Sequence, residues 1–179
     1  MPAPAPDTED FTGAFPKRKR ETKLIPFPQI GATLGPAFHF VPDANDEVSF
    51  TLDVFMGLRV MALEEHWGFM MRPEITYSYD SNDTWGGHRA SAGYGLGYGG
   101  YFAGVTFIPR FVVGSVGSEI GYGLRYGLRA DALLDLFNAE ISHQMMWPVA
   151  EPHHELRLTF GLDLAPIIGF IVLDRIFDF

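Results

Sequence analysis

Hydrophobic and charged side chains alternate along most of this chain. Between residues 48 and 63 a run of apolar side chains occupies the even positions, while the two charged residues, Asp53 and Arg59, are at odd positions. Residues 67–80 show the same alternation with the parity exchanged. Since successive side chains of a β-strand point to opposite faces, this period of two predicts strands with one apolar face and one polar face.

The alternation continues through eight segments, which we expect to form an all-β fold. Short connectors, such as residues 64–66 and 133–136, alternate with longer or more polar ones, such as residues 81–88 and 146–155. This order is typical of the hairpins of an eight-stranded antiparallel up-and-down β-barrel. The predicted strands are residues 30–41, 48–63, 67–80, 89–99, 103–113, 120–132, 137–145 and 156–164.

Two kinds of barrel fit this pattern: a membrane barrel with its apolar face outward, and a soluble lipocalin-like binding barrel with that face inward. An eight-stranded interior is barely wide enough for its own side chains, and the apolar parity carries many large residues, among them Tyr94, Phe107 and Tyr122. The polar parity instead mixes arginine with glycine, which suits a narrow interior. We therefore predict a transmembrane barrel and keep the soluble barrel as an alternative.

The polar faces carry nearly balanced charge, so we predict an interior plugged by ion pairs rather than an open pore. The planar guanidinium of arginine pairs with carboxylates in a fixed geometry. The predicted interior network consists of Asp53, Arg59, Arg72, Glu74, Arg110, Arg125, Arg129, Asp131, Glu140, Arg157 and Asp163.

Aromatic residues lie near both ends of the predicted strands. Membrane barrels carry such aromatic girdles at their two membrane–water interfaces. The predicted girdle residues are Phe38, Phe40, Trp67, Tyr77, Tyr79, Tyr98 and Tyr122.

Composition narrows the classes of function. The chain of 179 residues is long enough for one domain, and its net charge of −9 argues against a nucleic-acid binder. No run approaches the roughly 18 uncharged apolar residues of a membrane helix. The absence of cysteine excludes a thiolate metal site and disulfides. All three lysines lie in the first 23 residues, although soluble β-proteins normally place lysine on exposed strands.

The domain organisation follows from these patterns. We expect residues 1–27, rich in proline and charge, to be a flexible periplasmic tail and residues 28–165 to be the barrel. Residues 166–179 are expected to be a tail or a closing strand. The first 27 residues contain no hydrophobic segment of a secretory signal, so we expect a signal to have been removed unless the protein stays in the cytoplasm.

The strand pattern resembles the small eight-stranded outer-membrane barrels, the OmpA transmembrane domain and OmpX-like group. Phe179 resembles the terminal aromatic residue of their assembly signal, with Phe177, Leu173 and Ile171 at alternating positions before it. The resemblance implies a location in the bacterial outer membrane and a structural or interaction role in the cell envelope, without a cofactor. It also implies contact with the lipid bilayer, lipopolysaccharide and the outer-membrane assembly machinery. A protein partner would be reached through the loops or the N-terminal tail.

Other functions rest on weaker signals. A lipid-modifying enzyme of the outer leaflet would draw on Ser142, His143, His153, His154 and Glu155. Ser142 and His143 are adjacent, however, and so point to opposite faces of a strand, which argues against a catalytic dyad. We therefore expect no enzyme activity.

Metal binding also has weak support in the sequence. Asp80, Asn82 and Asp83 lack the spacing of a calcium loop and fit an Asx-rich turn better. His39, His66 and His88 are scattered along the chain, so we predict no metal site.

Overall fold

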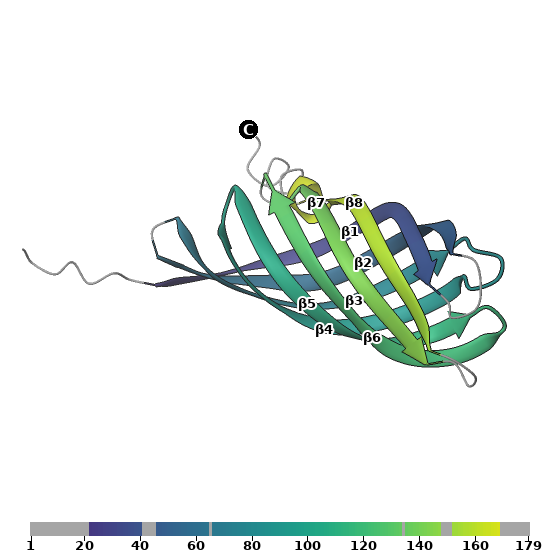
Figure 1. The fold of residues 1–179 in the computed structure, drawn as a ribbon. Helices are drawn as coiled ribbons and strands as arrows, with labels where there is room; N and C mark the ends of the chain where they lie inside the picture. The colour runs from purple at the N-terminus through teal and green to yellow at the C-terminus, as the bar shows by residue number, and fades with distance from the viewer. Residues whose placement is uncertain (1–21, 41–45, 65, 134, 148–151, 169–179) are drawn as a thin grey trace, which may run out of the picture.

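The computed structural model of the chain is a single closed β-barrel of eight antiparallel strands (Figure 1). It describes residues 22–40, 46–64, 66–133, 135–147 and 152–168. Each strand carries the predicted alternation of side chains, one parity buried and the other exposed. The strands are β1 (Lys23–Phe40), β2 (Glu47–Glu64), β3 (Trp67–Asp80), β4 (Gly87–Gly100), β5 (Ala103–Val116), β6 (Glu119–Ala132), β7 (Phe137–Trp147) and β8 (His153–Asp163).

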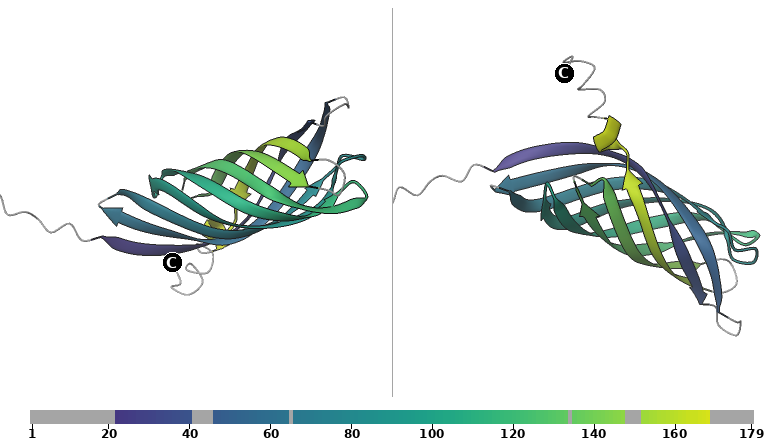
Figure 2. Two further views of the ribbon diagram at one scale, coloured as in Figure 1. Left: turned by 60° about the horizontal axis from the view of Figure 1, so that its bottom comes forward. Right: turned by 90° about the horizontal axis from the view of Figure 1, so that it is seen from above.

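The strands follow one another around the barrel in chain order, and β1 closes the ring by pairing antiparallel with β8. This seam runs from Gly31 opposite Asp163 to Phe40 opposite His154. The start of β1 and the end of β8 lie toward the end of the barrel that holds the β2–β3, β4–β5 and β6–β7 connections, which we call the turn end (Figures 1 and 2). The opposite end is called the loop end.

The predicted starts of β1 and β8 were wrong. Strand β1 begins at Lys23, so residues 23–27 belong to the barrel and not to the predicted tail, whose first 21 residues lie outside the described part of the chain. Strand β8 begins at His153, which places three residues of a predicted loop in the barrel wall. At the other end of β8, residues 165–168 are helical, and the described strands close without a ninth.

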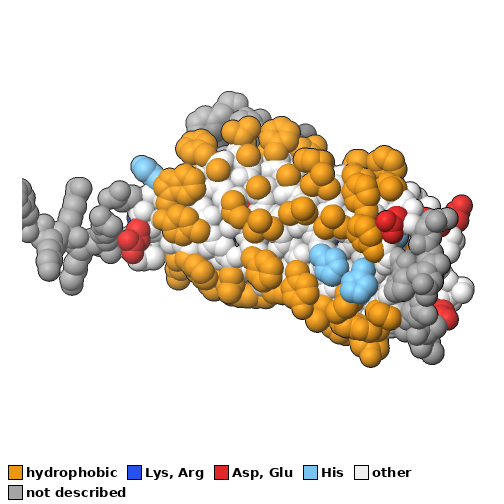
Figure 3. Space-filling model, viewed as in Figure 1, with side chains coloured by type: hydrophobic (Ala, Val, Ile, Leu, Met, Phe, Trp, Pro, Cys, Tyr) orange, Lys and Arg blue, Asp and Glu red, His pale blue; other side chains and the backbone are white. Residues whose placement is uncertain are grey.

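The apolar parity of every strand faces outward. Large hydrophobic side chains cover the wall, while acidic side chains appear near its two ends (Figure 3). Tyr94, Phe107 and Tyr122 are each about half exposed. The soluble alternative required these residues to face the axis and is therefore wrong. An outer wall of this kind is stable in contact with lipid acyl chains and not with water.

The described part of the chain holds no helix long and apolar enough to cross a membrane.

The polar parity faces inward, so the interior of the barrel is charged. Small apolar clusters lie toward both ends of this charged core. At the turn end, Met61, Leu63 and Met70 pack together with Tyr101 beside them, and at the loop end Trp85 packs on a second cluster. The second cluster consists of Val112, Val116 and Met146.

Candidate functional site: the charged interior

The middle of the barrel holds two carboxylates and two guanidinium groups from four different strands. Arg110 on β5 makes a bidentate contact with Glu140 on β7, with both nitrogen–oxygen distances at 2.7 Å, and its Nε donates to Glu74 on β3 at 2.7 Å. Arg129 on β6 donates to Glu140 at 2.8 Å and to Glu74 at 3.2 Å. Because each carboxylate binds both of these arginines, and Glu140 also contacts Arg125 at 3.3 Å, this group fills the section of the barrel between β3 and β7.

A second group crosses the barrel next to the first. Arg125 on β6 donates to Asp53 on β2 at 2.5 Å, and Arg157 on β8 donates to the other oxygen of Asp53 at 3.0 Å. Arg125 also donates to the hydroxyl groups of Ser142 and Ser78. Charge-assisted hydrogen bonds of this kind are roughly twice as strong as neutral ones.

The turn end of the interior is organised around Asp131 and Asp135. Arg72 on β3 contacts Asp131 on β6 at 3.1 Å. Arg59 pairs with Asp135 and donates to the carbonyl of Gly100 at 2.9 Å. Asp135 belongs to the β6–β7 connection and has a positive φ of 70°, a backbone conformation that aspartate tolerates better than most residues.

The loop end holds a fourth charged group. Arg89 on β4 donates to Glu155 on β8 at 2.5 Å and to the carbonyl of Trp85 at 2.9 Å. Glu155 also pairs with Arg157, which links this group to Asp53. The guanidinium and carboxylate groups therefore form a connected series from the middle of the barrel to its loop end.

All eleven residues assigned from the sequence to the interior are buried. Ten of them lie in ion pairs with one another or with a neighbouring interior residue. Asp163 instead accepts hydrogen bonds from the backbone N–H groups of Ile30 and Ala165. Sequence reasoning did not assign to the network Asp80, Arg89, Asp135, His39, His153 and Glu155.

The sequence contained a signal for some of the missed residues. Glu155 continues the odd parity of Arg157 and Asp163, so extending the predicted strand backward would have found it. Arg89 and Asp80 have the inward parity of their strands. Asp135 lies in a turn, where the period of two gives no information about side-chain direction.

Inward-facing glycine provides the space that the long arginine side chains occupy. A Cβ atom added at Gly127 would lie 2.5 Å from Oε1 of Glu140 and 2.8 Å from Nη1 of Arg110. At Gly93 it would lie 2.6 Å from Cγ of Arg110. All three distances are shorter than real Cβ contacts, so the bidentate Arg110–Glu140 pair in this position requires small neighbours.

The seven residues assigned to the girdle all face outward. Near the turn end, Trp67 and Tyr98 stack on neighbouring strands with ring centroids 6.4 Å apart. Near the loop end, the ring centroids of Tyr122 and Trp147 are 6.0 Å apart, and the hydroxyl of Tyr77 lies 2.5 Å from Nδ1 of His88. The other outward-facing residues of this set are Phe38, Phe40 and Tyr79.

The candidate enzyme residues are divided between the two faces of the wall. Ser142, His153 and Glu155 point inward, whereas the exposed His143 and the partly buried His154 lie on the outer face, with Nε2 of His143 at 3.3 Å from Nδ1 of His154. Ser142 accepts a hydrogen bond from Arg125 at 3.1 Å. The five residues therefore do not form one site.

The candidate cation ligands at the loop end form a turn. Asp80 accepts a hydrogen bond from the backbone N–H of Asn82, and the side chain of Asn82 accepts from the backbone N–H groups of Thr84 and Trp85. Asp83 is exposed. These contacts give the Asx-rich turn that the sequence favoured over a calcium loop.

A closed up-and-down barrel of eight strands with an apolar outer wall and a charged interior defines the class of small transmembrane β-barrels. The architecture fits the outer-membrane group that the strand pattern resembles. No family model matches the sequence, and no curated protein matches it either. A search of solved structures found Ail, the attachment invasion locus protein of Yersinia pestis, in complex with the heparin analogue sucrose octasulfate. The similarity covers 77% of this chain and 98% of Ail, with 12% sequence identity and a TM-score of 0.39.

Proposed function

We propose that the protein is a small bacterial outer-membrane β-barrel whose interior does not conduct ions and whose role in the envelope is structural or is exerted through its loops. The observation that carries the proposal is the reversal of the two faces, with charged side chains buried and large apolar side chains exposed. A soluble protein of this design would expose a continuous hydrophobic surface to water. A charge on that surface would cost roughly 2–4 kcal/mol at the midplane of a bilayer.

The contacts inside the barrel support a closed interior. Arg125 reaches Asp53 from the opposite side of the ring, and Arg89 reaches Glu155 in the same way from β4 to β8. Between these contacts, Arg110 and Arg129 bind Glu74 and Glu140. Ion pairs that span the barrel at several heights occupy the space that a water-filled channel would need.

Planar-bilayer recording tests the proposal. Protein folded into detergent micelles, with folding verified by a heat-dependent gel shift, is added to a bilayer beside a general porin as positive control. We expect the gel shift, insertion and no stable conductance of porin size. Reproducible porin-sized steps from the folded protein would contradict the closed interior. A monodisperse species in buffer without detergent would contradict the membrane location.

The described part of the loop end has exposed carboxylates. Asp46, Asp83 and Glu119 are exposed there, and Arg89 at the same end of the barrel is buried. We infer that a protein partner reached through these loops would present a basic surface. Folded barrels carrying Asp83→Asn and Glu119→Gln should then bind such a partner more weakly, with a smaller dependence of affinity on salt. The proposed outer-membrane location also includes contact of the barrel with lipopolysaccharide and with the outer-membrane assembly machinery.

A further inference from the structure

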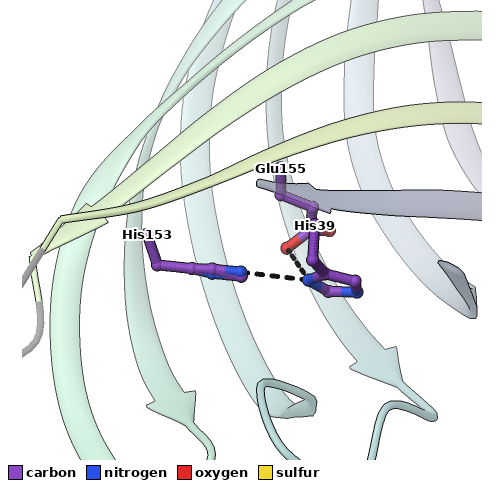
Figure 4. A group of neighbouring side chains, drawn as sticks. All are labelled: His39, His153 and Glu155. Atoms are coloured by element: carbon purple, nitrogen blue, oxygen red, sulfur yellow. Dashed lines mark hydrogen bonds and ion pairs between the residues drawn. The ribbon is translucent and has the colours of Figure 1, made fainter. Parts of the chain in front are cut away.

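Two histidines and a glutamate meet inside the barrel at the loop end of the seam between β1 and β8. Nδ1 of His39 lies 3.0 Å from Nε2 of His153 and 4.0 Å from Oε2 of Glu155 (Figure 4). The three ligand atoms all lie within 4.8 Å of one another. His39 is on β1, directly opposite Glu155 on β8, so the cluster bridges the first and last strands. All three side chains are almost completely buried.

The hydrogen bonds behind His39 determine which of its ring nitrogens carries the proton. Nε2 of His39 lies 2.8 Å from the hydroxyl of Ser49 and 3.3 Å from Oδ2 of Asp80. Ser49 donates its only hydroxyl proton to Oδ1 of Asp80 at 2.7 Å, so it can only accept from His39. Nε2 therefore carries the proton, and the lone pair of Nδ1 points toward His153. Histidines that bind metal ions are oriented in a similar way, by an acceptor on the other ring nitrogen; here that acceptor is the Ser49 hydroxyl, which is held in turn by the Asp80 carboxylate.

The buried charges around the cluster are close to balance. The described interior contains seven buried arginines, which are Arg59, Arg72, Arg89, Arg110, Arg125, Arg129 and Arg157. It contains eight buried acids, which are Asp53, Glu74, Asp80, Asp131, Asp135, Glu140, Glu155 and Asp163. At the loop end, Asp80 and Glu155 face Arg89, while Arg157 is shared between Glu155 and Asp53. The surplus acid lies at the turn end, where three acids share two arginines. At the loop end, negative charge for a cation comes from Glu155 itself, beside two imidazoles that bind metal ions in their neutral form.

We propose that this cluster binds a zinc ion through Nδ1 of His39, Nε2 of His153 and a carboxylate oxygen of Glu155. Zinc–nitrogen distances of about 2.0–2.1 Å in tetrahedral geometry place two ligating nitrogens about 3.3 Å apart, close to the 3.0 Å between the two imidazoles. Two imidazoles and one carboxylate are a ligand set that zinc uses in proteins. On binding, Glu155 moves toward the imidazoles and gives up part of its contact with Arg89. The ion then ties β1 to β8 and stabilises the closed barrel.

A second histidine pair must be separated from this site. His143 and His154 lie on the outer face, with Nδ1 of His154 at 3.3 Å from Nε2 of His143, and could also hold a metal ion. They have no carboxylate partner in the described residues comparable to Asp80. A parent variant with both His143→Gln and His154→Gln removes this pair and leaves the interior cluster unchanged.

The experiment measures zinc bound to this untagged parent variant, folded in detergent from metal-depleted denatured protein. Bound zinc is counted by elemental analysis after dialysis, and cobalt serves as a spectroscopic probe of coordination. We expect one equivalent of zinc, cobalt absorption typical of a tetrahedral site and a rise in the temperature of unfolding with zinc. His153→Gln added to the parent should abolish all three effects. Asp80→Asn, which removes the carboxylate behind His39, should weaken zinc binding about 10–100-fold.

Three results would overturn the proposal: no zinc on the folded parent, zinc that is retained by His153→Gln, or zinc found only when His143 and His154 are present. X-ray absorption of the zinc-loaded parent provides a test that does not require an interior variant to fold. Two imidazole ligands are expected there, and fewer than two would contradict the assignment. Because binding is scored separately from membrane insertion, failure of the metal site leaves the proposed barrel function intact.

Discussion

Arg125 on β6 reaches across the barrel to Asp53 on β2, with 2.5 Å between Nη2 and Oδ2. In a closed ring of eight strands, β2 and β6 lie four places apart in either direction, so this ion pair spans the barrel. Arg157 approaches Asp53 from β8 at 3.0 Å and shares its charge. Asp53 is thus a carboxylate that two buried guanidinium groups share, although Arg157 also pairs with Glu155 and Arg125 also contacts Glu140.

Asp53→Asn is expected to destabilise the barrel strongly. The amide removes the negative charge from Arg125 and Arg157 and leaves two buried cations undercompensated, and losing one partner of a buried ion pair costs about 3–5 kcal/mol. The free energy of unfolding in urea, measured in detergent or liposomes, checks this. Asp83→Asn removes the same charge from an exposed loop position and should change the stability by less than about 0.5 kcal/mol. Equal effects of the two substitutions would show that Asp53 has no special role.

Glu74→Leu tests the middle group of charges. Leucine supplies neither of the oxygens that accept from Arg110 at 2.7 Å and from Arg129 at 3.2 Å. The variant should lose its heat-dependent gel shift at a lower temperature and unfold at lower urea than any substitution in the loop at residues 81–86. Glu74→Gln keeps one accepting oxygen, and its stability is expected to lie between that of the leucine variant and that of the unsubstituted protein. A leucine variant as stable as the unsubstituted protein would mean that Arg110 and Arg129 find sufficient hydrogen-bond partners without Glu74.

Gly127→Ala tests whether the interior is tightly filled. The added methyl group would meet Oε1 of Glu140 at 2.5 Å and Nη1 of Arg110 at 2.8 Å, and overpacking of this kind typically costs about 1–3 kcal/mol. The matched control is Ala130→Val, which adds volume on the exposed face of the same strand. Urea unfolding should show a loss for Gly127→Ala and almost none for Ala130→Val. If both variants are as stable as the unsubstituted protein, the interior can accept an added methyl group and is not tightly filled around Arg110.

Arginine substitutions on the outer wall should have an effect that depends on their depth in the membrane. Met56 is exposed near the middle of β2, whereas Ile120 is exposed at the loop end of β6. Met56→Arg should cost about 2–4 kcal/mol in liposomes and Ile120→Arg about 0–1 kcal/mol. Unfolding in urea of the liposome-inserted proteins measures the difference. The reverse order, or no cost at either site, would contradict a bilayer centred on the middle of the strands.

The strand pattern was sufficient to predict the eight strands and their two faces, because a period of two is a local property of the chain. It failed at the start of β1, because the first 27 residues, rich in proline and charge, indicated a tail, and Pro28 follows directly. In the structure Pro26 and Pro28 pair with β2, whereas the seam with β8 begins only at Gly31. Proline lacks an N–H to donate and is tolerated where one edge of a strand has no ladder partner.

Contacts that depend on register or on turns could not be predicted. His39 and His153 are 114 residues apart and meet only because the seam places His39 opposite Glu155. Asp135 enters the interior from a turn with positive φ, for which the alternation of a strand gives no guidance. The residues of the ion-pair network were therefore predictable as a set, while their partners depended on the three-dimensional closure of the barrel.

The direction of the apolar face can be measured directly, because the chain contains no cysteine and single cysteines can be introduced as unique labelling sites. Spin labels at Tyr94→Cys, Phe107→Cys and Leu128→Cys, in protein folded into liposomes, report their accessibility to oxygen in the acyl chains and to a water-soluble nickel complex. We predict high accessibility to oxygen and low accessibility to nickel at all three positions. Labels that collide with the nickel complex and are shielded from oxygen would contradict a wall that faces lipid.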